Sequence, residues 1–272
     1  MSRSLIVNAD DFGLDNRINQ GIAECCSSGI VRSISLVANG PAFEHALSLA
    51  RQMPDTGIGV HLCLVNEKPL LAGMAGQNGL LPQDCYRLFF KLCSRRLNLL
   101  DVEQELDAQI KKILDSGITP THLDSHQYTH LIPAIFDIVM RLGKKYNIKW
   151  IRCPRGWRRA RGASSADLFK KTYLALFSRR RIEALKGNGF RCADISFGFT
   201  GSGRLSEQAV REFLQRFGSG MADLACHPGY LPQSGKYRAW GYCWEEEAAV
   251  LKSKGIRTLI EKLNISLTNY AA

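Results

Sequence analysis

The stretch that decides the fold is a short apolar run that ends in two carboxylates and a turn, Ser4-Leu5-Ile6-Val7-Asn8-Ala9-Asp10-Asp11-Phe12-Gly13. Its first half reads as a β-strand. Three other apolar runs carry polar groups in a similar way, and they are Gly59-Val60-His61-Leu62, His122-Leu123-Asp124-Ser125-His126 and Cys226-His227-Pro228-Gly229. Polar residues at the carboxyl ends of successive strands are where an α/β enzyme assembles its catalytic groups. The four segments therefore predict one active site, whose carboxylates and imidazoles suit a divalent metal and an activated water.

Segments that read as strands and helices alternate along the rest of the chain. The predicted strands cover residues 4–8, 33–38, 57–62, 121–125, 149–153, 194–197, 222–227 and 265–268. The predicted helices cover residues 15–28, 42–53, 101–116, 133–146, 206–217, 244–253 and 257–262. We expect Asp15, Asp101 and Ser206 to be N-caps, with Gln104 completing a capping box. The alternation predicts one α/β domain over residues 1–272, an irregular (β/α) barrel of mostly parallel strands, with a doubly wound open sheet as the alternative.

Composition places the chain among cytoplasmic globular proteins. It has 272 residues, of which 45% are hydrophobic, enough for a full core. No apolar run approaches the roughly 18–20 residues that span a bilayer. The N-terminus enters a strand directly, without a signal-peptide pattern, so nothing argues for secretion. Nine cysteines without a Cys-x-x-Cys pair read as free thiols in a reducing compartment.

The net charge of +11 is concentrated in one segment. Residues 152–191 hold twelve Lys and Arg against two acidic residues, and the rest of the chain is almost neutral. Two basic helical segments, about 84–97 and 155–191, combine this charge with apolar faces. Such helices suit an anionic membrane surface, here the inner face of the membrane, or a substrate that carries phosphate. The alternative is a solvated cover packed over the barrel, and the oligomeric state stays open between a monomer and a homodimer.

Charge alone would also permit nucleic-acid binding, either as the function itself or as part of a basic binding protein without catalysis. That reading leaves the carboxylates at the strand ends unexplained, and few aromatic residues lie among the arginines. We therefore expect no nucleic-acid partner.

The adjacent carboxylates Asp10 and Asp11 give the strongest chemical signal. Neighbouring side chains on a strand point to opposite faces, but at the strand's end both can reach one crevice. Two adjacent aspartates repel each other and each needs a partner. A metal ion that binds one of them leaves the other free to accept a proton from water. The alternative is that one of them caps the following helix, although Asp15 is the better cap.

Histidines supply the remaining candidate ligands. His61 lies in an apolar strand, where a core histidine is the alternative, and Gly59 leaves room beside it. His126 shares a strand face with His122 and Asp124, and it lies furthest toward the carboxyl end. Asp124 is expected to orient an imidazole or to contact substrate.

Two further histidines are assigned to substrate and to proton transfer. His130 follows the strand of residues 121–125 and is expected to touch substrate. His227 precedes a Pro-Gly turn, which would hold its imidazole at a rim where a general acid belongs. A histidine bonded only to the turn backbone is the alternative for His227. His45, on a predicted helix without polar company, reads as structural.

In this order, the four segments resemble the YdjC-like carbohydrate deacetylase family. That family is marked by an Asn-Ala-Asp-Asp-Phe-Gly opening, a Gly-x-His-Leu strand, a His-x-Asp-Ser-His strand and a late His-Pro-Gly turn. The resemblance extends from Leu5 to about Asn269. It implies a barrel enzyme that removes acetyl groups from N-acetylated sugars, as in chitooligosaccharide deacetylases and a protein associated with hopanoid biosynthesis.

By position, the resemblance implies that Asp11, His61 and His126 are metal ligands, Asp10 the base and His227 the acid. The ion would be zinc or magnesium, with manganese or cobalt as alternatives. This chain departs from the family at Tyr128, where the family has a histidine, so Tyr128 is expected to shape the substrate site.

Residues 183–229 look closer to the hopanoid-associated branch than to the chitooligosaccharide branch. The basic helical segments beside a sugar deacetylase site favour a glycolipid or lipid-linked sugar as substrate, with soluble chitooligosaccharides as the alternative. A glycosidase using Asp10 and Asp124 as its carboxylate pair is the enzymatic rival.

Overall fold

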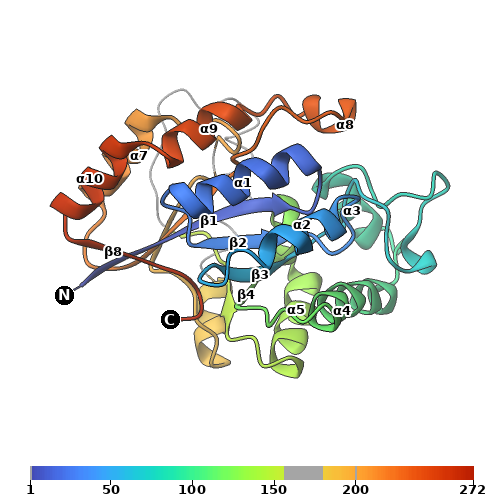
Figure 1. Ribbon diagram of the computed structural model, residues 1–272. Coiled ribbons are helices and arrows are strands. Elements are labelled where there is room, and N and C mark those ends of the chain that lie inside the picture. The colour runs from blue at the N-terminus through green and yellow to red at the C-terminus, as the bar shows by residue number, and fades with distance from the viewer. Residues whose placement is uncertain (1, 156–179, 200) are drawn as a thin grey trace.

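The computed structural model describes residues 2–155, 180–199 and 201–272 (Figure 1). Its strands form one eight-stranded sheet in the order β5-β4-β3-β2-β1-β7-β6, with β8 paired to β1. The strands are β1 (Arg3–Phe12), β2 (Ser33–Leu36), β3 (Gly57–Leu62), β4 (His122–Ser125), β5 (Trp150–Ile151), β6 (Ile195–Phe197), β7 (Gly220–Cys226) and β8 (Ile265–Thr268). Each pairing between these strands is parallel. The predicted α/β barrel is therefore confirmed.

The two ends of the strand order, β5 and β6, approach each other. A parallel bridge links Trp150 to Arg191. The backbone N–H of Ser196 donates to the carbonyl of Arg155, 2.9 Å away. These links bring the ends of the sheet together into an irregular ring rather than leaving an open sheet.

Helices cover the outside of the sheet, as Figure 1 shows. They are α1 (Asn16–Ser28), α2 (Phe43–Ala50), α3 (Cys85–Cys93), α4 (Leu99–Asp115), α5 (Pro133–Lys145), α7 (Glu207–Arg216), α8 (Gly235–Arg238), α9 (Trp244–Leu251) and α10 (Lys254–Lys262), with 3₁₀ turns η1 (Ala72–Met74) and η2 (His126–Leu131). Residues 180–187 are also helical. The sequence did not predict η1, η2 or α8, because each is too short for a helical period to show.

Two of the three predicted caps are confirmed and one is wrong. Asp15 accepts from Arg17 N, and Ser206 accepts from Ala209 N. The cap of α4 is Asn98 rather than Asp101, which lies in the first turn. The helix starts earlier than predicted. The pattern missed its first two residues, Leu99 and Leu100, because they are 43% and 58% exposed and do not follow the apolar period of the helix.

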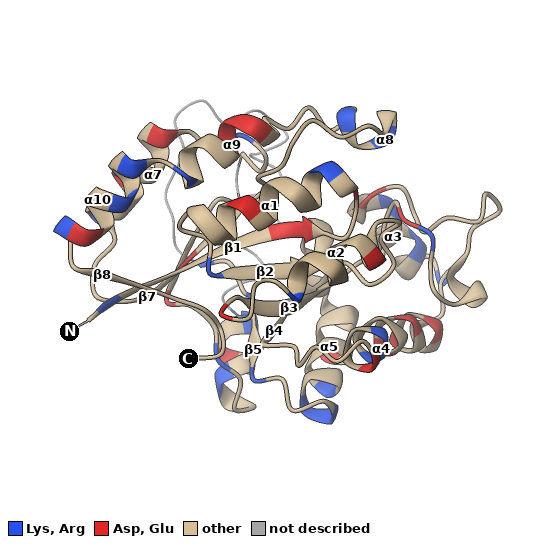
Figure 2. Cartoon of the chain, viewed as in Figure 1, with Lys and Arg blue, Asp and Glu red and all other residues tan. Residues whose placement is uncertain are grey.

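Strand alternation divides the molecule into two interiors. On β1, Leu5, Val7 and Ala9 face the outer core between sheet and helices. Ile6 faces inward, where it packs with Trp150 and Tyr270 in a separate apolar cluster. This cluster closes the amino end of the barrel. The polar side chains beyond it belong to the carboxyl ends of the strands, the acidic end of β1 in Figure 2.

The basic segments differ from the prediction in one important residue. Of the predicted cover, residues 85–93 form α3, whereas residues 156–179 of the second segment lie outside the described residues. Arg152, counted as part of the basic excess, is only 2% exposed and belongs to the barrel interior. All nine cysteines are free thiols, as predicted. Among the described residues, no helix has the length and apolar character needed to cross a membrane.

Candidate active site

A bulge in β1 brings Asp10 and Asp11 to the same side. The register between β1 and β2 shifts between Ala9 and Phe12. Asp11 lies in the left-handed region with φ 69°, which aspartate tolerates better than most residues. The strand therefore turns by one residue at Asp11. Without this turn, alternation would send its carboxylate into the outer core.

Asp11 lies between two imidazoles. Its Oδ1 is 2.9 Å from His126 Nδ1 and 3.5 Å from His61 Nε2. One potential ligand atom from each of the three residues lies within 4.8 Å of the others. All three side chains are buried, and Asp11 Oδ2 has no hydrogen-bond partner among the described residues. A buried carboxylate oxygen without a partner is costly, so this set of one oxygen and two nitrogen donors fits a divalent cation.

The carboxylates and imidazoles of this site shift one another's pKa values. Burial alone would raise the pKa of Asp11, but His126 and His61 hold it well below its usual range. Burial alone would lower the pKa of His61, but Asp124 and Asp11 raise it to about 10. With its pKa raised in this way, the His61 imidazole carries a positive charge beside these carboxylates at neutral pH.

Asp124 orients His61. Its Oδ1 is 2.8 Å from His61 Nδ1, which directs the Nε2 atom toward Asp11. Its Oδ2 accepts from Ser35 Oγ at 2.7 Å and contacts Arg152 Nη1 at 2.8 Å. This is the arrangement of a carboxylate that fixes the tautomer of a ligand histidine.

Asp10 is held by a buried guanidinium. Arg152 Nη1 donates to both carboxylate oxygens of Asp10, at 2.9 and 2.8 Å. Asn8 Nδ2 donates to Oδ1 at 2.8 Å. The sequence reasoning missed Arg152 because it treated the basic segment as surface. Arg152 directly follows β5, at the carboxyl end of a strand like Asp10 near the end of β1, and this position was the signal that could have revealed it.

His227 lies beside Asp10 at the rim. Its Nε2 is 3.9 Å from Asp10 Oδ2, and its Nδ1 is buried without a partner among the described residues. Its backbone N–H donates to Glu247 Oε2 at 2.6 Å. The other oxygen of Glu247 accepts from Leu205 N at 2.8 Å. Glu247, a buried residue of α9 that the sequence reasoning also missed, thus fixes the turn that carries the imidazole.

The comparisons with known proteins agree with this geometry. The model of the YdjC-like protein family matches residues 4–262. The chain belongs to the YdjC-like family. A relative from Geobacillus stearothermophilus named carbohydrate deacetylase is 30% identical, over 99% of this chain and 98% of its own. A solved structure from Enterococcus faecalis V583, named as a candidate cellobiose-phosphate cleavage protein, has a TM-score of 0.76 at 27% identity and covers 99% of this chain and 98% of its own.

In this YdjC-like chain, the residues predicted to bind substrate are all buried. Asp124 and His130 are 0% exposed and Tyr128 is 6% exposed. His130 Nδ1 is 2.5 Å from Ser125 Oγ, and its Nε2 is 2.7 Å from the carbonyl of Arg152. Burial lowers the pKa of His130 to about 4, so the ring is neutral at pH 7. Tyr128 lies in η2 with φ 54°, its ring centroid 6.2 Å from that of His130.

Two further expectations change. The space that Gly59 leaves by lacking a side chain is occupied by the His122 ring rather than by His61. A Cβ at residue 59 would lie 2.2 Å from that ring. His45 does have polar company, because Asn19 Nδ2 lies 3.2 Å from its Nδ1.

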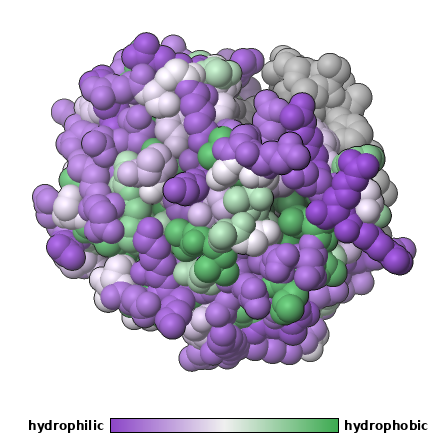
Figure 3. All heavy atoms as spheres, turned by 90° about the vertical axis from the view of Figure 1, so that its right-hand side faces the viewer, coloured by the Kyte–Doolittle hydropathy of each residue, from purple (hydrophilic) through white to green (hydrophobic). Residues whose placement is uncertain are grey.

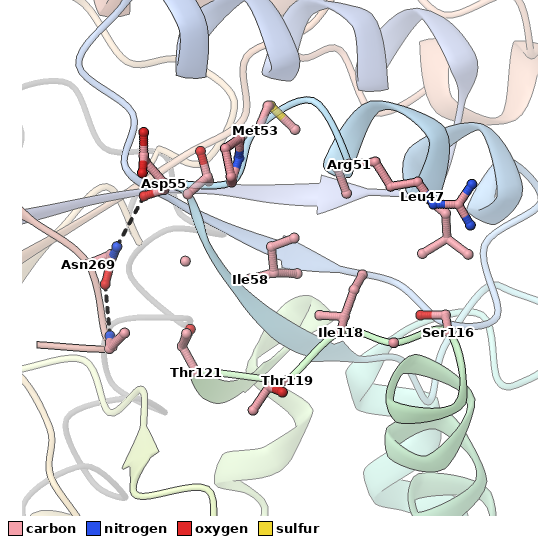
Figure 4. A pocket seen from close by; sticks show the side chains of 16 residues that line it. Leu47, Arg51, Met53, Asp55, Ile58, Ser116, Ile118, Thr119, Thr121 and Asn269 are labelled. Carbon is pink, nitrogen blue, oxygen red and sulfur yellow. Dashed lines mark hydrogen bonds between the residues drawn. The ribbon is translucent and has the colours of Figure 1, made fainter.

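A pocket of about 540 Å³ lies at the opposite end of the barrel (Figure 4). It lies at the start of β3, between the loops that precede β3 and β4, with Asn269 at one side. Asn269 Nδ2 donates to the carbonyl of Asp55, as the dashed line shows. Its charged lining residues are Arg51 and Asp55, with no histidine among them. The cluster of Asp11, His61 and His126 at the carboxyl ends of the strands shares no residue with the lining of this pocket.

Proposed function

We propose that this protein is a metal-dependent carbohydrate deacetylase that removes the N-acetyl group from an amino sugar. The observation that carries the proposal is the buried set of Asp11, His61 and His126, next to a second carboxylate and a rim histidine. The membership in the YdjC-like family and the name of the Geobacillus stearothermophilus relative support the same activity.

Asp11, His61 and His126 would hold the cation, zinc or magnesium in preference to manganese or cobalt. A divalent ion there would lower the pKa of a water molecule and polarise the acetyl oxygen. Asp124 keeps His61 in the tautomer that presents Nε2. The chain therefore supplies both the donors and the hydrogen bond that orients one of them.

Asp10 is the proposed base and His227 the proposed acid. Asp10 takes a proton as the water oxygen bonds to the acetyl carbon. The C–N bond then breaks, and His227 delivers a proton to the amine nitrogen, which leaves as the free amine beside acetate. The two side chains are 3.9 Å apart, close enough to serve one reacting group from neighbouring positions. Arg152 fixes the orientation of the Asp10 carboxylate.

The buried residues Asp124, Tyr128 and His130 are proposed to position this machinery rather than to touch the sugar. His130 links β4 to the residue after β5 through Ser125 and the Arg152 carbonyl. It therefore fixes the backbone from which the Arg152 side chain reaches Asp10.

A lipid-linked amino sugar is the proposed substrate, with soluble chitooligosaccharides as the alternative. Helix α3 supports the lipid: Tyr86, Phe89 and Phe90 are 50%, 41% and 61% exposed. Figure 3 shows apolar side chains among hydrophilic ones on the right-hand face of Figure 1, where α3 lies and toward which β1 points. Salt-sensitive sedimentation with anionic liposomes tests the membrane contact, and its absence would favour the soluble sugar.

Amine release is the test of the whole proposal. Metal-replete protein is assayed on N-acetylglucosamine oligomers, sugar nucleotides and N-acetylglucosaminyl lipids, before and after chelation. A deacetylase of this design releases amine and acetate, and the chelator abolishes both. Cleavage of glycosidic bonds that survives chelation would instead favour the glycosidase.

A further inference from the structure

Two aromatic residues, Trp240 and Tyr242, lie between His126 and His227. The ring of Trp240 stacks on that of His126, with centroids 5.1 Å apart and planes at 30°. The ring of Tyr242 meets His227 edge-on, with centroids 5.1 Å apart. The two aromatic rings are 5.5 Å from each other. They therefore form a continuous surface from a proposed metal ligand to the proposed acid.

The rings of Trp240 and Tyr242 are half-buried, whereas the aromatic residues next to them are fully buried. Tyr237 and Trp244 are only 2% and 1% exposed. Trp244 packs beneath the pair, with ring centroids 6.2 Å from Trp240 and 5.0 Å from Tyr242. An aromatic residue whose sole role was core packing would be expected to share their burial.

A buried carboxylate anchors the segment that carries Trp240. Glu67, from the loop after β3, is 4% exposed. Lys236 Nζ donates to its Oε1 at 2.6 Å, and the Tyr237 hydroxyl lies 3.3 Å from both oxygens. These bonds hold helix α8 against the loop after β3, and the second of them is made by Tyr237, three residues before Trp240.

Gly203 leaves the space that the ring of Tyr242 occupies. Gly203 has φ +76°, and a Cβ built on it would meet the Tyr242 ring at 2.1 Å. The carbonyl of Gly203 also accepts from Cys243 N at 2.7 Å. The position of Tyr242 therefore depends on the missing side chain at residue 203, and both rings are fixed before any ligand binds.

We propose that Trp240 and Tyr242 form the sugar-binding wall of this site and contact the pyranose ring that carries the N-acetyl group. This rests on the proposed deacetylase function. A pyranose presents a face of C–H bonds, and an aromatic face is electron-rich and apolar, so the two attract each other. A sugar on this wall would have its acetamide between the metal ligands and His227, where the C–N bond must break.

The test separates sugar binding from chemistry. Trp240→Ala and Trp240→Phe are assayed on diacetylchitobiose and on 4-nitrophenyl acetate, a substrate without a sugar. Trp240→Ala should raise KM for the disaccharide about tenfold, the loss of a contact of this size. Its kcat/KM on the ester should fall much less than its kcat/KM on the disaccharide, and Trp240→Phe should keep most sugar activity. Calorimetric titration with chitobiose, the deacetylated disaccharide, should show the same loss of affinity.

The outcomes are distinguishable. Wild-type protein without amine release on any amino sugar contradicts the proposed function itself. Active wild type with an unchanged Trp240→Ala overturns the wall, and so does an equal loss on both substrates, which would mean that the ring merely supports His126. Leu100→Ala removes an exposed apolar residue of α4 outside the site and controls for non-specific effects.

Discussion

The guanidinium of Arg152 organises the interior of the barrel. It contacts Asp10 and Asp124 at 2.8 Å each and Asp223 at 3.4 Å, and it is almost completely buried. Buried carboxylates are tolerated only where they are paired and hydrogen-bonded. The fold therefore ties together the proposed base and the residue that orients His61, and a single substitution can affect both.

The two adjacent aspartates should differ in what their loss removes. Asp11→Ala deletes the only oxygen donor of the proposed ligand set and should abolish both zinc binding and turnover. Asp10→Asn should keep the metal, because Asp10 contacts Arg152 rather than the ligands' donor atoms, but lower kcat by about 10²–10⁴-fold. Metal content and amine release on the same samples check this, with exposed Asp115→Ala as control. Equal metal loss in both variants would contradict the division of roles.

Asp223 should make stability depend on pH. Burial raises its pKa to about 6, against the opposing effect of Arg152. Between its ordinary pKa of 3.8 and 6 the folded protein binds more protons than the unfolded chain. The free energy of unfolding therefore falls as pH rises through this window and levels off above it.

The matching variant is Asp223→Asn, which cannot ionise. At pH 7 it should be more stable than wild type by up to about 3 kcal/mol, with a flatter profile between pH 4 and 6. Urea unfolding across this range is the measurement. An Asp223→Asn protein that is less stable at pH 7 would show instead that the ion pair between Asp223 and Arg152 stabilises the fold by more than burial of the carboxylate costs.

At the scale of elements, the apolar pattern of the sequence predicts that a strand exists, but it does not predict where a bulge interrupts that strand. The apolar run from Leu5 predicts the first strand, and in the structure Leu5, Val7 and Ala9 all lie in the outer core. The turn at Asp11 comes from a bulge against β2, a partner far along the chain. The start of α4 was hidden for a similar reason, since Leu99 and Leu100 are exposed and follow no apolar stripe.

The loop before α7 offers a matched pair of glycines. Gly201 and Gly203 have φ +75° and +76°. Among the residues that the structure describes, a Cβ at Gly201 would meet nothing within 4 Å, whereas one at Gly203 would collide with Tyr242. Both alanine variants should lose about 1 kcal/mol through backbone strain. Only Gly203→Ala should also displace Tyr242 and raise KM for the amino sugar. Melting temperature and steady-state kinetics of the pair check this, and indistinguishable kinetics would argue against a fixed Tyr242.

At the scale of the whole molecule, the sequence could predict that Asp11, His61 and His126 come together, because each lies near the end of its own apolar run. Their role as metal ligands rests on the family resemblance and stays a prediction. Arg152 and Glu247 were missed because their roles depend on partners from other elements: Asp10 is 142 residues from Arg152, and His227 is 20 residues from Glu247. A buried arginine has the same sequence appearance as a surface one. Local charge counts therefore overstate the basic surface by the residues that the fold takes inside.

Metal binding should stabilise the entire fold. The proposed donors come from β1, β3 and the start of η2, so a cation would join three elements that are separate along the chain. At about 1,000 times its Kd, a ligand that binds only the folded state adds about 4 kcal/mol, which corresponds to roughly 10 °C for a chain of this size. Melting curves with zinc and with chelator measure the difference. Asp11→Ala should show no shift, whereas Asp115→Ala should shift like wild type. A shift that survives in Asp11→Ala would place the cation at other residues.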